Sequence, residues 1–74
     1  MQITTKLFAG FRDGRFAVRG MEVDPETTVG RVVEELEIPP TEVGVLLCNG
    51  RHVDFGHRLR EGDTCSIFPK VGGG

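Results

Sequence analysis

The residues with the clearest chemical use are the three glycines that end this sequence, Gly72, Gly73 and Gly74. A carboxylate at Gly74 is a poor electrophile, so joining it to sulfur or nitrogen requires prior activation, usually as an acyl-adenylate shielded from water. A terminus of glycines can enter a narrow channel in an activating enzyme, where any Cβ would clash. The ending therefore predicts a protein whose own terminus reacts and which supplies no catalytic side chain.

Two other interpretations of these glycines compete with this one. The first is that they are a frayed end or a remnant of cloning, which is common at protein termini. The second is a phosphate-binding loop, and it fails because no helix follows the glycines to supply an N-terminal dipole.

The cysteines and histidines indicate no second chemical centre. Cys48 and Cys65 each lie in an apolar run, where a thiol usually behaves as a small hydrophobic group. His52 and His57 stand five residues apart without a cysteine or carboxylate cluster at ligand spacing, so we expect no metal site. A Cys–His nucleophile pair would lack an orienting third group. We therefore expect no bound cofactor and no enzyme activity.

Length and charge exclude several classes of protein. Seventy-four residues allow one domain. Nine basic and eleven acidic residues give a net charge of −2 without a run of either sign, which argues against nucleic-acid binding. The sequence has no stretch of roughly 20 apolar residues to span a membrane and no signal peptide at its start. We expect a cytoplasmic protein.

The first part of the chain predicts two strands. Residues 3–8 alternate between apolar and polar positions, as in a half-buried strand. Residues 10–14 resemble a turn, because Asp-Gly supplies the left-handed backbone that a turn needs. A second strand follows over residues 15–23, and Gly20 within it suggests a bulge.

A single helix is predicted next. Thr28 is a suitable N-cap, and Pro39-Pro40 is expected to end the helix. Apolar residues spaced i, i+3, i+4 and i+7 form one stripe that must dock on a sheet, since so short a helix is unstable alone. The stripe consists of Val29, Val32, Val33 and Leu36.

The second half of the chain predicts three further strands. Residues 42–48 form a Val-rich strand, and Asn49-Gly50 is a strong hairpin signal leading into residues 51–54. After an irregular segment, residues 64–68 form a last strand that ends at Pro69. The order predicts an α+β roll, a mixed sheet of four to five strands with one helix packed on one face. Residues 1–69 would form this domain, and residues 70–74 a flexible tail.

This order and two motifs resemble the MoaD/ThiS sulfur carriers, which are ubiquitin-like proteins with the β-grasp fold. The opening Lys6-Leu7-Phe8-Ala9-x-x-Arg12 is similar to that of molybdopterin synthase small subunits. The more specific motif is Leu59-x-Glu61-Gly62-Asp63-x-x-x-Ile67-Phe68-Pro69-x-Val71-x-Gly73-Gly74. Lys70 replaces a proline that is common in the family, and Gly72 replaces an alanine or threonine.

The resemblance implies that Gly74 is adenylated by a ThiF/MoeB-like enzyme, which uses ATP and magnesium, and then becomes a thiocarboxylate. The sulfur would be donated in biosynthesis of a molybdopterin- or tungstopterin-like cofactor, with a molybdopterin synthase large subunit as a partner. Alternatives are a protein modifier conjugated through Gly74, a thiamine-thiazole carrier of the ThiS type, and an interaction module with an inert tail.

A docking surface is predicted where the tail begins. If Leu7 and Ile67 face the helix, Phe8 and Phe68 face away from it, and the implied fold puts their strands side by side. An exposed aromatic pair beside a tail is more often a binding surface than an accident, unless Phe11 or Phe55 covers it. The predicted docking surface comprises Phe8, Phe68, Pro69, Lys70 and Val71.

Overall fold

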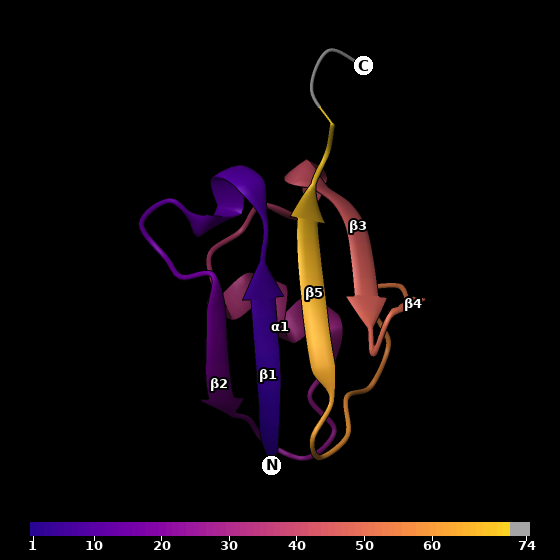
Figure 1. Ribbon diagram of the computed structural model, residues 1–74. Coiled ribbons are helices and arrows are strands. Elements are labelled where there is room, and N and C mark those ends of the chain that lie inside the picture. The colour runs from indigo at the N-terminus through magenta and orange to yellow at the C-terminus, as the bar shows by residue number, and fades with distance from the viewer. Residues whose placement is uncertain (72–74) are drawn as a thin grey trace.

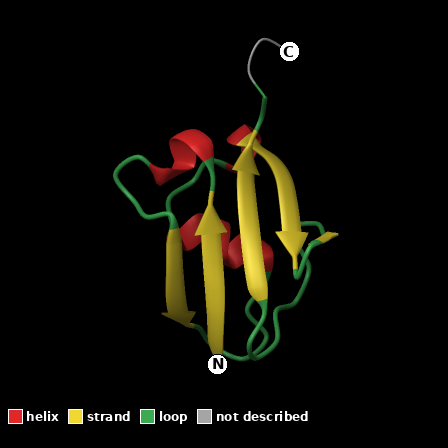
Figure 2. Ribbon diagram, in the orientation of Figure 1, coloured by secondary structure: helices red, strands yellow, loops and turns green. Residues whose placement is uncertain are grey.

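The computed structural model describes residues 1–71 and contains one sheet, one α-helix and two short 3₁₀ helices. Figure 1 shows the sheet with helix α1 behind it, and Figure 2 marks the same elements by type. In chain order the elements are β1 (Gln2–Leu7), η1 (Ala9–Arg12), β2 (Val18–Glu22), α1 (Val29–Glu35), η2 (Pro40–Glu42), β3 (Val43–Cys48), β4 (Arg51–His52) and β5 (Thr64–Pro69).

The sheet is mixed and its strands lie in the order β2-β1-β5-β3-β4. The two central strands, β1 and β5, pair in parallel, whereas every other named pair is antiparallel. Helix α1 covers one face, and the face toward the viewer in Figure 1 carries no helix among residues 1–71. The predicted α+β roll with one helix on a mixed sheet of up to five strands is confirmed.

The core lies between the sheet and the helix, as the period-two pattern predicts. In β1, Ile3, Thr5 and Leu7 are buried, whereas Lys6 is exposed. The other side of the core comes from the helix stripe, because Val29 and Val32 are fully buried. One side of β1, β3, β5 and α1 is therefore committed to the core, and the opposite face of the sheet is left open to a partner.

The helix begins as predicted but ends earlier. The Thr28 hydroxyl accepts a hydrogen bond from the Arg31 amide at 3.2 Å, which confirms the N-cap. The helix stops at Glu35, and Glu37 adopts a left-handed conformation with φ of 57°. This reversal brings Ile38 into the core, where it is 2% exposed. The prediction that the proline pair ends the helix was wrong, because the chain has already turned.

The second strand and the predicted bulge also differ from expectation. Strand β2 begins only at Val18, and residues 9–12 form a 3₁₀ helix within the region predicted as a turn. Gly20 pairs regularly with Thr4, so the predicted bulge there was wrong. The irregularity occurs in β3 instead, between Val43 and Val45.

Gly44 lies at this irregularity and lets β3 approach the end of β5. A Cβ at position 44 would stand 2.8 Å from both the Pro69 carbonyl oxygen and the Lys70 Cα. Beside it, the Lys70 amide donates a hydrogen bond to the Glu42 carbonyl at 2.9 Å. The backbone is thus held closely at the point where the chain leaves the sheet.

We therefore predict that Gly44→Ala destabilises the fold by about 1–3 kcal/mol, because the new methyl group overlaps backbone that cannot rotate away. Gly20→Ala is the matched control, since a Cβ there meets nothing within 4 Å. It should leave stability unchanged or raise it by up to about 1 kcal/mol. Urea unfolding measures both, and equal midpoints for the two variants would contradict the close approach at Gly44.

Candidate functional site

Two phenylalanines mark the end of the sheet from which the chain leaves. Phe8 follows β1 and Phe68 lies in β5, and their rings stack with centroids 4.0 Å apart and planes inclined by 8°. Their neighbours Leu7 and Ile67 are paired across the same strands and are fully buried on the helix side. The predicted alternation is therefore confirmed, and both rings belong to the open face.

Neither of the phenylalanines that could have covered this pair does so. Phe11 is 5% exposed and belongs to the core, whereas Phe55 packs beside α1 through contacts with Gly30. Phe8 and Phe68 are half-buried rather than fully exposed, because each ring covers a face of the other. The two rings thus form one continuous aromatic surface on the open face of the sheet.

An apolar hollow of about 530 Å³ opens beside the stack. All five residues of the predicted docking surface line it, and Val71 at its rim is 91% exposed. The complete lining is Phe8, Ala9, Val45, Leu47, His52, Phe68, Pro69, Lys70 and Val71. A hollow walled by aromatic and aliphatic side chains with one adjacent lysine suits an apolar partner side chain.

Val45, Leu47 and His52 were not among the predicted site residues, and neither was Ala9. The signal for the first two was present, because the next residues along, Leu46 and Cys48, are buried and alternation places Val45 and Leu47 on the opposite face. His52 reaches the hollow only because the hairpin pairs it with Leu47. The predicted channel residues Gly72, Gly73 and Gly74 lie outside the described residues.

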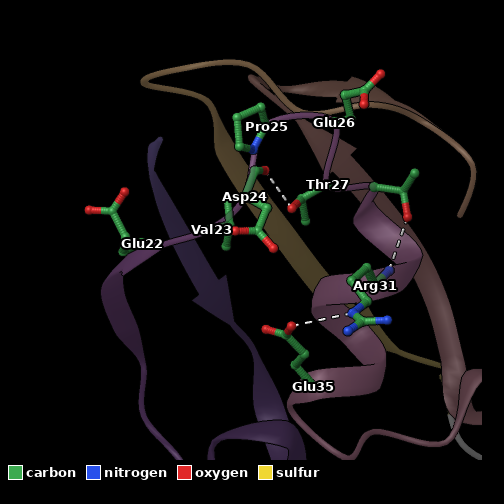
Figure 3. Close-up of a pocket in the computed structure, with 9 residues that line it drawn as sticks. Glu22, Val23, Asp24, Pro25, Glu26, Thr27, Arg31 and Glu35 are labelled. Carbon is green, nitrogen blue, oxygen red and sulfur yellow. Dashed lines mark hydrogen bonds and ion pairs between the residues drawn. The ribbon is translucent and has the colours of Figure 1, made fainter.

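A second hollow, of about 430 Å³, lies between the end of β2 and the start of α1 (Figure 3). Its rim is rich in carboxylates, but these serve the local structure. Glu35 pairs with the Arg31 guanidinium at 3.3 Å, and Glu26 pairs with the Arg58 guanidinium at 3.7 Å. Glu22 pairs with the N-terminal ammonium at 3.0 Å. These contacts stabilise the helix and its entry loop, and we assign no function to this hollow.

The two cysteines are free and poorly reactive. Burial raises the pKa of Cys48 to about 11, with a hydrogen bond to Asp63 adding to the effect. Burial likewise raises the pKa of Cys65 to about 12. Because a nucleophile needs the thiolate form, neither thiol is suited to nucleophilic chemistry at neutral pH in the absence of a bound metal ion. The structure does bring Cys48 close to His57 and Asp63, which their sequence spacing did not reveal.

The comparisons with known proteins define the class. A family described as Mut7-C ubiquitin matches residues 11–72, and the chain belongs to this family of ubiquitin-like proteins. No curated protein matches it. Within residues 1–71, no helix has the length and apolar character that crossing a membrane would require.

Solved structures give the more particular relations. The Haloferax volcanii HVO 2177 protein is 32% identical over the whole chain and 87% of its own length, with a TM-score of 0.80. SAMP1, small archaeal modifier protein 1 of the same organism, is 26% identical over both full chains, with a TM-score of 0.76. A chain in the complex of molybdopterin-converting factor subunits 1 and 2 from Helicobacter pylori shares the fold, at 16% identity over both full chains and a TM-score of 0.68. The predicted relation to the ubiquitin-like carriers is thus confirmed at the level of family and fold.

The opposed faces of β5 give a test of the site. We predict that Phe68→Ala costs about 1 kcal/mol of stability, mainly the lost ring stacking. Ile67→Ala, one residue earlier, should cost about 2–5 kcal/mol because it opens a cavity in the core. Chemical denaturation of both variants measures this difference. A cost for Phe68→Ala equal to that for Ile67→Ala would mean that Phe68 belongs to the core.

Proposed function

We propose that this protein is a sulfur carrier whose Gly74 carboxylate is adenylated and converted to a thiocarboxylate. The observation that carries the proposal is that Lys70 and Val71, which directly precede the glycines, also line the apolar hollow. A partner that covers the hollow therefore meets the start of the tail. Membership of a ubiquitin-like family supports the same conclusion.

The energy balance explains why a docking surface should adjoin the tail. Ordering three backbone residues in a channel costs about 3–6 kcal/mol. Burying roughly 200 Å² of apolar surface at the hollow contributes about 5 kcal/mol at ~25 cal/mol per Å². Docking the body thus offsets the cost of threading a tail that has no side chains of its own to contribute binding energy.

The chemistry then takes place in the partner. A Gly74 carboxylate oxygen attacks the α-phosphate of ATP, and pyrophosphate leaves to give the acyl-adenylate. Hydrosulfide released by a sulfur donor attacks the carbonyl carbon, and AMP leaves with the oxygen that was activated, which gives the thiocarboxylate. The activating enzyme, of the ThiF/MoeB type, supplies ATP and magnesium. This chain contributes a rigid body that positions its terminus.

The recipient of the sulfur is proposed to be a pterin precursor held by a molybdopterin synthase large subunit. Support comes from the Helicobacter pylori structure, in which subunit 1 of the molybdopterin-converting factor is in complex with subunit 2. The opening motif around Phe8 and Arg12 also resembles that branch. Transfer to a thiazole precursor is the alternative within the same chemistry.

A protein modifier is the second candidate, and it is supported by the likeness to SAMP1, a protein described as a modifier. In that case the Gly74 acyl group passes to a lysine amine of a target and forms an amide bond. The two functions share activation and docking. They differ in the atom, sulfur or nitrogen, that bonds to the Gly74 carbonyl carbon when AMP leaves.

Intact mass distinguishes these candidates. We predict that the protein, coexpressed with its cognate activating enzyme, gains the mass difference of one sulfur replacing one oxygen at Gly74. A ladder of larger species would instead indicate a modifier. The variant lacking Gly73 and Gly74 is the control and should show neither product. If the natural chain carries further residues beyond position 74 that are never removed, or if no such enzyme modifies Gly74, the proposal is wrong.

Docking gives a kinetic prediction. Phe68→Ala should raise KM for adenylation about tenfold or more, which corresponds to about 1.4 kcal/mol of lost binding. The turnover number should change little, because the stack contacts the partner before and during reaction alike. Phe55→Ala, at an exposed phenylalanine away from the hollow, is the control and should leave KM unchanged. An unchanged KM for Phe68→Ala would contradict the proposed role of Phe68 in docking.

A further inference from the structure

Three side chains able to bind a metal meet at the end of the sheet opposite the tail. Cys48 ends β3, Asp63 precedes β5, and His57 lies in the loop before it. One ligand atom from each lies within 4.8 Å of the others. They also line a common hollow of about 520 Å³. Sulfur, nitrogen and oxygen donors together form a set that zinc accepts readily.

The fold holds two of the three donors firmly. Asp63 accepts hydrogen bonds from the Arg60 amide at 2.8 Å and the Asn49 side-chain amide at 2.9 Å. The Cys48 thiol donates to the same carboxylate at 3.4 Å. These bonds orient Asp63 toward Cys48, so the pair is fixed before any ion arrives.

The third donor is held through its backbone. The His57 carbonyl accepts from the Val29 amide at 2.9 Å, and the His57 amide donates to the Asp54 carbonyl at 3.2 Å. The main chain at His57 is therefore tied to the first turn of α1, while the imidazole retains its side-chain rotations. A modest rotation can aim the ring at an ion held by Cys48 and Asp63.

We propose that Cys48, His57 and Asp63 bind one Zn²⁺, with water as the fourth ligand. In a tetrahedral site with zinc–ligand distances of 2.0–2.3 Å, ligand atoms stand roughly 3.5 Å apart. The sulfur and carboxylate oxygen are already 3.4 Å apart. Only the imidazole has to move, and closing a separation of up to 4.8 Å to roughly 3.5 Å brings it nearer by no more than about 1.3 Å.

Binding of Zn²⁺ releases one proton from the protein. The Cys48 thiol loses its proton to solvent, and the sulfur–zinc bond takes the place of its hydrogen bond to Asp63. The bonds from Arg60 and Asn49 to the carboxylate can remain and support it as a ligand. Thiolate and carboxylate together carry two negative charges, which neutralise Zn²⁺. This matters because the side chains of Arg51 and Arg60 border the same hollow.

Cobalt is the probe for the first test, because a thiolate bound to Co²⁺ gives a charge-transfer band in the near ultraviolet. The tag-free full chain should show this band, and Zn²⁺ should abolish it by displacing the cobalt. At ten times the dissociation constant, zinc should raise Tm by roughly 5–10 °C. Absence of the band at millimolar cobalt would overturn the proposal.

Matched variants decide which side chains bind. Cys48→Ser should remove the band, and His57→Ala should weaken zinc binding at least about tenfold. His52→Ala, the other histidine, should leave it unchanged. Equal affinity of His57→Ala and the unaltered protein would indicate adventitious binding to one cysteine and overturn the proposal. If Cys48→Ser does not fold, the His57→Ala variant still tests the proposal. The imidazole of His57 lies outside the core cluster, so its removal should not unfold the protein.

The outcome is independent of the sulfur-carrier proposal. The cluster lies where β5 begins, whereas the tail leaves where β5 ends (Figure 1). Removing Gly73 and Gly74 should abolish charging of the terminus and leave zinc affinity unchanged. Equally, His57→Ala should impair zinc binding and leave charging intact. If deletion of the two glycines lowered zinc affinity, the tail and not the cluster would hold the metal.

Discussion

The parallel pairing of β1 with β5 is the constraint on which the rest of the structure depends. These strands come from opposite ends of the chain, and their pairing places Leu7 opposite Ile67. Because side chains alternate along both strands, the next residues, Phe8 and Phe68, then meet on the opposite face and stack. One pairing register thus fixes the core, the aromatic surface and the point at which the chain leaves the sheet.

A shift of this register by one residue would reverse both faces at once. The buried side chains of β5 would turn to solvent, and the phenylalanine would be forced against α1. Selection for a stable core and selection for a binding surface therefore act on the same strands.

Local patterns predicted the elements well where the physics is local. The Thr28 cap and the Asn49-Gly50 turn depend on neighbouring residues only, and both were predicted correctly. The early helix end was not, because the turn at Glu37 serves the burial of Ile38, a tertiary requirement. The bulge was misplaced for the same reason, since Gly44 is needed by the distant end of β5.

The functional residues likewise divide into those that local patterns predict and those that depend on tertiary contacts. Alternation, together with the neighbouring strands implied by the family resemblance, identified Phe8 and Phe68. The approach of His57 to Cys48 depends instead on a loop that crosses back to the first turn of α1. Spacing along the chain carries no record of such a crossing. Contacts between irregular segments are therefore the part of a binding site that a single sequence predicts least well.

The backbone hydrogen bond between Lys70 and Glu42 also limits how far Gly74 can reach from the body of the protein. Four residues follow Lys70 in the sequence, and even fully extended they span at most about 14 Å. Any reaction centre that acts on Gly74 must therefore lie within that distance of Lys70. If Gly74 reacts as proposed, an activating enzyme with a deeply recessed centre needs an entrance wide enough to admit the body of this chain.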